Sequence, residues 1–128
     1  MPGNDNTRAD IRVLDAWSRT LGSNSQKIAD IEDSQGGIPS HTDLSRITTQ
    51  GELFIGEHAT NIAGILIANH NSIGIAGLNK FAQLYSYVYN GNAQWADKIR
   101  DARLDGNQII NISQGSYESM PNVSLQLM

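Results

Sequence analysis

Two neighbouring carboxylates and one histidine are the residues whose types and positions could perform acid–base chemistry. Glu32 and Asp33 lie at the end of the strand-like segment "QKIADIE", and His58 opens a run that is apolar at helical spacing. The positive end of a helix disfavours a protonated imidazole, so a histidine there suits a neutral base whose tautomer a carboxylate fixes. The plainer alternative is that Asp33 caps a turn and His58 is a half-exposed residue at a helix start.

The segments that would position these side chains alternate between helix-like and strand-like patterns. Apolar residues recur at i, i+3, i+4, i+7 and i+8 after the histidine, which predicts a helix from about residue 58 to about residue 69. Further helices are expected at 11–20, between Asp10 as cap and Gly22 as stop, and at 92–106, between Asn92 and Gly106. Strands are expected at 26–32, 82–89 and 107–113, with a short extended pair within 46–56.

Alternating strands and helices predict an α/β fold, in which a doubly wound parallel sheet carries helices on both faces. In such a sheet, ligands and chemistry gather at the carboxyl ends of the strands. Those ends are residues 32–33, 89–91 and 113–115. The carboxylates and the histidine are therefore expected at one edge of the sheet.

Composition sets limits on the class of protein. The 128 residues suffice for one domain or part of one, and the net charge of −4 argues against nucleic-acid binding. No apolar run approaches the ~18 residues of a membrane helix, so no membrane partner is expected. The absence of cysteine excludes disulfides and thiolate chemistry. The segment "MPGNDNTRAD" lacks a signal-peptide core, and the composition fits any compartment.

The order of motifs resembles the N-terminal half of a subtilisin-like serine peptidase domain. "KIADIEDSQG" is similar to the strand that bears the aspartate of the family's triad, and "SHTDL" to the turn that follows it. "HATNIAGILIANHNSIGIAGL" resembles the histidine helix and the loop behind it, and "LYSYVYNG" and "IINISQG" resemble the strands that line the substrate cleft. The resemblance covers nearly the whole chain from about Ile11 onward, and it implies a partial subtilisin-like fold.

The resemblance implies a triad of aspartate, histidine and serine that hydrolyses peptide bonds. His58 would be the general base, and Asp33 would orient its imidazole and stabilise its charged form. The family has Asp-Ser-Gly, whereas this chain has an additional Gln35 before the glycine. If the additional residue lies before the aspartate instead, Glu32 takes that position; the Ser34 that follows Asp33 favours Asp33.

The resemblance also implies a calcium ion in the loop behind the histidine helix, because Ca²⁺ takes six to eight oxygen ligands. The ligands would be the Asp43 carboxylate, the Asn71 side chain and the carbonyls of Asn69, Ile73 and Ile75. An additional ligand from Asn4, Asp5 or Asn6 is a weaker match. The alternative is an asparagine-rich turn without metal, and His41 and His70 are expected to be surface turn residues.

The family grips a polypeptide substrate as an added β-strand between two segments. Here these would be Tyr89, Asn90 and Gly91, and Ser113, Gln114 and Gly115. The family's nucleophile lies in a Gly-Thr-Ser-Met-Ala motif that this sequence lacks, and Ser119 and Ser124 are poor substitutes. Residues 1–128 are therefore expected to be the N-terminal part of a peptidase domain, inactive alone and completed by a C-terminal half. The family resemblance implies an extracellular location.

Two other classes remain open from the sequence. One is a non-catalytic relative that acts as a binding module, which the missing serine motif favours. The other is a response-regulator-like domain that uses Glu32 and Asp33 to bind magnesium. That class needs an aspartate and a lysine at the ends of later strands, and "YVYNG" and "INISQG" supply neither.

Overall fold

The computed structural model describes residues 11–33, 35–50, 54–89 and 94–113. Three helices and four strands alternate through this part of the chain. In order they are α1 (Val13–Trp17), β1 (Lys27–Glu32), β2 (Ile47–Gln50), α2 (Glu57–Ile67), β3 (Gln83–Val88), α3 (Trp95–Leu104) and β4 (Ile109–Asn111).

The four strands form one sheet in the order β2-β3-β1-β4, and each neighbouring pair is parallel. β1 therefore lies between β3 and β4, although the three strands are far apart in sequence. The register aligns Asp30 with Ser86 of β3 and with Asn111 of β4. Because the strands are parallel, the carboxyl ends of β1, β3 and β4 point to the same edge.

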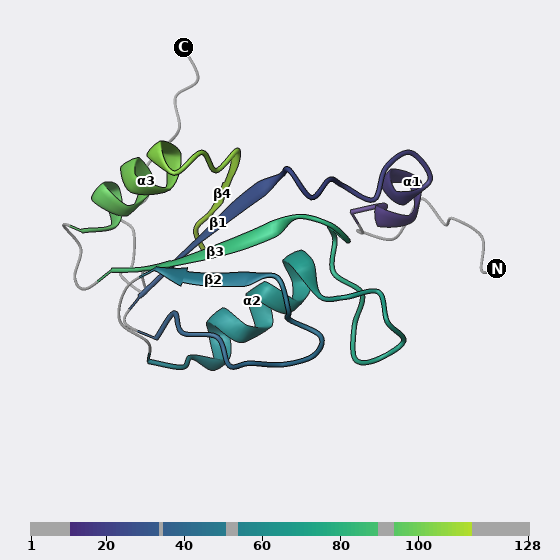
Figure 1. Cartoon of the computed structure of the whole chain (residues 1–128), viewed down its shortest axis with the longest axis horizontal. Coiled ribbons are helices and arrows are strands. Elements are labelled where there is room, and N and C mark those ends of the chain that lie inside the picture. Colours follow the sequence, from purple (N-terminus) through teal and green to yellow (C-terminus); the bar gives the residue numbers. More distant parts are fainter. Residues whose placement is uncertain (1–10, 34, 51–53, 90–93, 114–128) are drawn as a thin grey trace, which may run out of the picture.

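The two faces of the sheet are covered by different helices (Figure 1). On one face, Ile28 and Leu84 pack with Ala63 and Ile67 of α2. On the other face, Ala29, Ile31, Tyr87 and Tyr89 pack with Ala102 of α3. This arrangement confirms the expected α/β fold, a parallel sheet with helices on both faces.

The side chains of β1 alternate between these two buried faces of the sheet. Successive side chains of a strand point to opposite faces, so Ile28, Asp30 and Glu32 share the α2 face. Ala29 and Ile31 share the α3 face. The α2 face of the central strand thus carries two buried carboxyl groups in succession.

Two sequence expectations need correction. The first helix is only five residues long, and Ile11 and Leu14 are exposed instead of forming its buried face. The described residues of 46–56 pair with other segments instead of with each other: β2 pairs with β3, and Ile55 makes an isolated bridge with Gly37. Apolar spacing identified these segments as ordered, but partner choice depends on contacts from distant parts of the chain.

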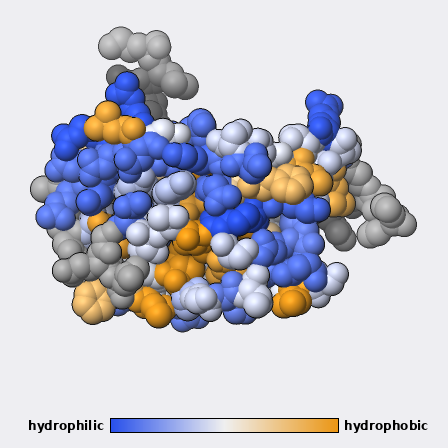
Figure 2. Space-filling view, in the orientation of Figure 1, coloured by the Kyte–Doolittle hydropathy of each residue, from blue (hydrophilic) through white to orange (hydrophobic). Residues whose placement is uncertain are grey.

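The surface differs between the two layers. Figure 2 shows a largely hydrophilic surface over α3, whereas apolar side chains are visible around α2 and the loops beside it. Exposed apolar residues flanking α2 include Phe54, Ile55, Ile73 and Ile75. Among the residues that the structure describes, no helix has the length and apolar character needed to cross a membrane.

Candidate active site

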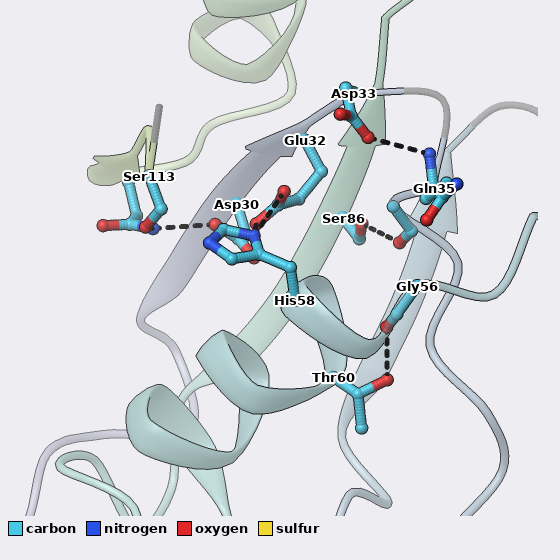
Figure 3. Close-up of polar contacts among 11 residues, drawn as sticks. Asp30, Glu32, Asp33, Gln35, Gly56, His58, Thr60, Ser86 and Ser113 are labelled. Atoms are coloured by element: carbon cyan, nitrogen blue, oxygen red, sulfur yellow. Dashed lines mark hydrogen bonds and ion pairs between the residues drawn. The ribbon is translucent and has the colours of Figure 1, made fainter. Parts of the chain in front are cut away.

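The side chains of Glu32 and His58 meet at the carboxyl end of β1 (Figure 3). The imidazole Nδ1 lies 3.0 Å from Glu32 Oε2 and 3.1 Å from Oε1. A carboxylate can only accept, so this contact places the ring proton on Nδ1 and leaves Nε2 with a free lone pair. The Glu32 side chain is 7% exposed and the His58 side chain 59% exposed. The pair therefore joins a buried carboxylate to an imidazole that solvent can reach.

Close backbone packing fixes the start of α2 against the turn that follows β1. The Gly37 N–H donates to the Phe54 carbonyl at 2.8 Å, and the Gly56 N–H donates to the Gly37 carbonyl at 2.9 Å. A Cβ at Gly56 would lie 1.7 Å from the Gln35 carbonyl oxygen, so only glycine fits there. Since Gly56 is the residue before α2, these contacts set the position of His58 relative to β1.

Asp33 does not occupy the position predicted for it. Its carboxylate accepts a hydrogen bond from the Gln35 N–H at 3.0 Å, within the turn after β1 (Figure 3). Strand alternation explains the difference, because a residue one position beyond Glu32 points away from the α2 face. The expectation that Asp33 contacts His58 is corrected to Glu32. The alternation of "IADIED" was the signal that could have decided between the two carboxylates.

Burial raises the pKa of Glu32, and the hydrogen bond from His58 opposes that effect. The like charge of Asp33 adds a smaller upward contribution to the same pKa. A carboxylate in this position is stabilised chiefly by the imidazole, and most of all by its protonated form. The pair can therefore hold one tautomer of a neutral base and then accommodate the cation that forms when the base takes up a proton.

A second buried carboxyl group, Asp30, was missed by the sequence analysis. It is fully buried, and its Oδ1 accepts a hydrogen bond of 2.8 Å from Asn111 Nδ2. Burial is the main reason that its pKa rises to about 6, and the like charge of Glu32 adds to that rise. A carboxylate inside the otherwise apolar strand "KIADI" was a visible but unused signal.

The predicted substrate-binding segments are only partly described. Tyr89 is buried, and its N–H continues the β1–β3 ladder by donating to the Glu32 carbonyl at 3.0 Å. The Ser113 hydroxyl accepts a hydrogen bond from Asn111 at 2.8 Å. Asn90, Gly91, Gln114 and Gly115 lie outside the described residues. The structure thus places Tyr89 and Ser113 at the ends of strands that flank β1.

A buried carboxylate from the turn between β1 and β2, Asp43, faces the loop behind α2 and has one unpartnered oxygen. Asp43 is 6% exposed, and its Oδ1 has no hydrogen-bond partner among the described residues. A Cβ at Gly74 would lie 2.9 Å from Asp43 Oδ2, so the carboxylate faces residues 69–75. Gly74 also has a φ of +57°, which glycine adopts without strain.

The other predicted ligands of this loop have contacts of their own. Asn71 Oδ1 accepts a hydrogen bond from the Ile73 N–H at 3.0 Å, which is the geometry of an asparagine turn. The Asn69 side chain donates to the Thr42 carbonyl at 2.7 Å and accepts from Arg46; the ligand predicted from this residue is its backbone carbonyl. Ile73 and Ile75 have exposed side chains.

The two remaining histidines make local contacts. His41 Nδ1 accepts a hydrogen bond from the Asp43 N–H at 3.1 Å. His70 Nε2 lies 2.9 Å from the Gly77 carbonyl, and its ring centroid lies 4.9 Å from that of Trp17. Across the described ranges, no three histidine or acidic side chains cluster as a metal site.

Comparison with known proteins gives two matches. The model of the subtilase family matches residues 26–126, which include β1 and α2. A thermostable alkaline protease of Halalkalibacterium halodurans is 31% identical over 129 residues, which cover 90% of this chain and 35% of that protein. The chain therefore spans about a third of the length of this curated relative. No solved structure matches.

Proposed function

The chain belongs to the subtilase family, and from that membership we propose that it carries the histidine and the carboxylate of a serine endopeptidase triad. His58 is the general base and Glu32 is the carboxylate that orients it. The observation that supports this assignment is the double contact of His58 Nδ1 with the two oxygens of Glu32. In this proposal glutamate replaces the aspartate that the family's motif predicts.

The proposed step uses the two ring nitrogens differently. Nε2 of His58 accepts the proton of a serine hydroxyl as that oxygen attacks the carbonyl carbon of the scissile peptide bond. The imidazole is then a cation, and the buried Glu32 carboxylate stabilises it through Nδ1. Nε2 returns the proton to the leaving amine when the peptide bond breaks, and water later releases the acyl group by the reverse proton path.

In this proposal the nucleophile comes from a segment outside these 128 residues. The sequence has no Gly-Thr-Ser-Met-Ala motif, and within the described part of the chain no serine hydroxyl is recorded on His58. Ser119 and Ser124 lie outside the described residues. We therefore expect activity only in a longer protein that supplies the serine and its oxyanion-stabilising donors.

A polypeptide substrate is expected to add as a strand at the ends of β3 and β4. The proposed segments are 89–91 and 113–115, and the ends of β3 and β4 lie on either side of β1, next to the Glu32–His58 pair. Main-chain hydrogen bonds to a substrate give affinity without demanding a particular sequence. This placement would bring a scissile bond near the exposed Nε2 edge of His58.

Calcium binding in the loop at 69–75 is a further part of the proposal. The unpartnered, buried Asp43 Oδ1 fits a cation, and Asn71 Oδ1 keeps a second lone pair after accepting from Ile73. With the carbonyls of Asn69, Ile73 and Ile75, these oxygens would hold Ca²⁺, whose role would be to stabilise the loop behind the histidine helix. The described residues supply these oxygens, and an additional ligand from the first ten residues is also proposed.

The calcium proposal predicts a melting temperature that rises with Ca²⁺ and falls with a chelator, because a ligand that binds only the folded state stabilises it. Asp43→Asn should remove most of this dependence, whereas Asp15→Asn, on the exposed helix α1, should retain it. Differential scanning fluorimetry with and without chelator measures both variants. A wild-type melting curve that chelator leaves unchanged would identify the loop as a plain asparagine turn.

The function is tested on the longest protein that the coding sequence specifies, beside the 128-residue chain. The longer protein should hydrolyse a fluorogenic peptide and react with a fluorophosphonate probe, which requires an activated serine. His58→Ala should abolish both, and His41→Ala should abolish neither. Stoichiometric labelling of the short chain would show that its own serine is the nucleophile. Absence of hydrolysis in a folded longer protein would favour the binding module.

A further inference from the structure

Asp30 is a buried carboxyl group whose hydrogen bonding is incomplete. Its side chain has no exposed surface, and of its two oxygens only Oδ1 has a recorded partner, Asn111 Nδ2 at 2.8 Å. An ionised carboxylate without a cation or further donors is costly to bury. No ion pair recorded among the described residues includes Asp30. The fold therefore tolerates a negative charge at this position without compensating it in the resting state.

Among the described residues, one source of positive charge is recorded as acting on Asp30. Asp30 and Glu32 lie two residues apart on the same face of β1, beneath the first turn of α2, where Figure 3 shows them beside the His58 ring. The neighbouring positions in the sheet are Ser86 and Asn111, which are uncharged. His58 lowers the pKa of Asp30, which reflects an attraction between the two groups. The Asn111 hydrogen bond also favours the ionised form of Asp30 and has the larger effect on this pKa. Among the groups recorded as acting on Asp30, the imidazole is thus the one that can carry a full positive charge, and only when it is protonated.

The contact with Asn111 holds Asp30 in place and connects it to β4. One hydrogen of Asn111 Nδ2 is donated to Asp30 Oδ1, and the other is donated to the Ser113 hydroxyl at 2.8 Å. Asn111 thus uses both amide hydrogens, and the carboxyl group cannot rotate away without breaking this link. Asp30 is therefore a fixed charge at a defined position relative to the base.

We propose that Asp30 is a positioning residue that stabilises the protonated form of His58, acting together with Glu32 as a second buried carboxylate. The catalytic meaning of this inference rests on the proposed function. A fixed charge that meets its counter-charge only when the base takes up a proton favours the transition state over the resting state. Asp30 touches neither substrate nor the reacting atoms in this scheme.

The charge on Asp30 depends on pH, and so does its effect. Its pKa of about 6 means that Asp30 is largely neutral below that pH and ionised above it. The titratable groups recorded as acting on it are Glu32 on its own strand and His58 on α2. The like charge of Asp33 in turn raises the pKa of Glu32. These groups titrate as a coupled set, so the acid limb of a pH–rate profile would report the set and not the imidazole alone.

The test is the pKa of His58, measured by NMR titration of the imidazole Cε1–H in the 128-residue chain. Asp30→Asn keeps the acceptor for Asn111 and removes the charge, and it should lower the pKa of His58 by about one unit. Asp33→Asn removes a nearby charge whose carboxylate bonds to the Gln35 N–H, so it should shift the pKa of His58 by less than half as much. A shift in Asp30→Asn below about half a unit, or one no larger than in Asp33→Asn, would overturn the inference.

A second measurement needs no variant, in case Asp30→Asn does not fold. In the wild-type chain the His58 resonance should show an additional titration step that coincides with ionisation of the Asp30 carboxyl carbon. Independent titrations of the two groups would contradict the proposal. Both NMR readouts are separate from peptidase activity, so a correct pKa shift in a protein that cleaves nothing would refute the proposed function alone.

In an active longer protein, kinetics add a readout that a purely structural role would not affect. Asp30→Asn should lower kcat about tenfold with KM unchanged, since one pKa unit corresponds to a factor of ten. The acid limb of its pH–rate profile should move to lower pH by the same amount as the pKa of His58 measured by NMR. An unchanged acid limb together with a wild-type kcat would also overturn the inference.

Discussion

The two faces of β1 differ in the partners that their buried side chains have. On the α3 face, Ala29 and Ile31 meet apolar partners, and the polar Tyr87 hydroxyl is satisfied by Asp105 and Asn107. On the α2 face, Asp30 and Glu32 are both buried, but Asp30 has an unpartnered oxygen and Glu32 depends on a histidine that solvent can reach. The α3 face also has an unpartnered oxygen, Asn107 Oδ1, but that amide carries no charge, whereas the α2 face retains the ionisable groups that the proposed chemistry requires.

The buried ionisable groups on the two faces also differ in their response to pH. Tyr87 donates to Asp105 Oδ2 at 2.8 Å and accepts from Asn107 at 2.9 Å. Burial and the contact with Asp105 raise its pKa to about 12, and the bond from Asn107 opposes that rise. It stays neutral at every ordinary pH. Asp30, with a pKa of about 6, changes charge near neutrality on the opposite face of the same sheet. Tyr87 thus keeps its charge state across ordinary pH, and Asp30 does not.

The largest expected effect on stability comes from Asp30→Asn. The pKa of Asp30 is about 6 in the folded chain against 3.8 for an unperturbed group. Between these values the folded state binds more protons than the unfolded state, so the free energy of unfolding falls as pH rises from about 4 to about 6. That loss amounts to up to about 3 kcal/mol at neutral pH. Asp30→Asn removes the titrating group, so the variant should not lose this free energy of unfolding as the pH rises.

Urea unfolding of the wild type and Asp30→Asn at pH 4, 5, 6 and 7 measures this effect. The variant should show a flatter pH dependence and be the more stable protein at pH 7, with a residual slope from Glu32, whose pKa is also raised by burial. Parallel curves for the two proteins would mean that Asp30 does not titrate in this range and that the contrast between the faces is wrong.

A smaller effect is expected from Tyr87→Phe on the α3 face. The change removes a buried hydroxyl that bonds to Asp105, while Asn107 keeps its bond of 2.8 Å to the Ala102 carbonyl. The free energy of unfolding should fall by about 1 kcal/mol, and by the same amount at pH 4 and pH 7. The same urea series serves for this variant. A loss that varied with pH, or a displaced His58 resonance, would show that the two faces are not independent.

Much of the fold was predictable from apolar spacing. The boundaries of β1, β3 and α2 lie within two residues of those expected, because each buries a continuous apolar face. The helix at 11–20 was overestimated: only Val13–Trp17 is helical, and Ile11 and Leu14 are exposed. The pairing of β2 with β3 depends on contacts between distant segments, which periodicity cannot reveal.

The site was predictable in its residue types but not in its geometry. His58 at a helix start and a carboxylate at a strand end were both visible in the sequence. The motif favoured Asp33, whereas the two-residue period of the strand places Glu32 on the face that α2 covers. Asp30 and Asn111 were not recognised, because their meeting depends on the register between β1 and β4.

The central claim is that Glu32, and not Asp33, holds the imidazole of a peptidase base. It is tested most directly by kcat/KM for a fluorogenic peptide in Glu32→Gln and Asp33→Asn variants of the active longer protein. Glu32→Gln cannot favour the Nδ1–H tautomer in the same way, so it should lower kcat/KM about 10³- to 10⁴-fold. Asp33→Asn, which keeps its acceptor for Gln35, should remain within about threefold of the wild type. The reverse ranking, with Asp33→Asn the more damaging change, would contradict the account.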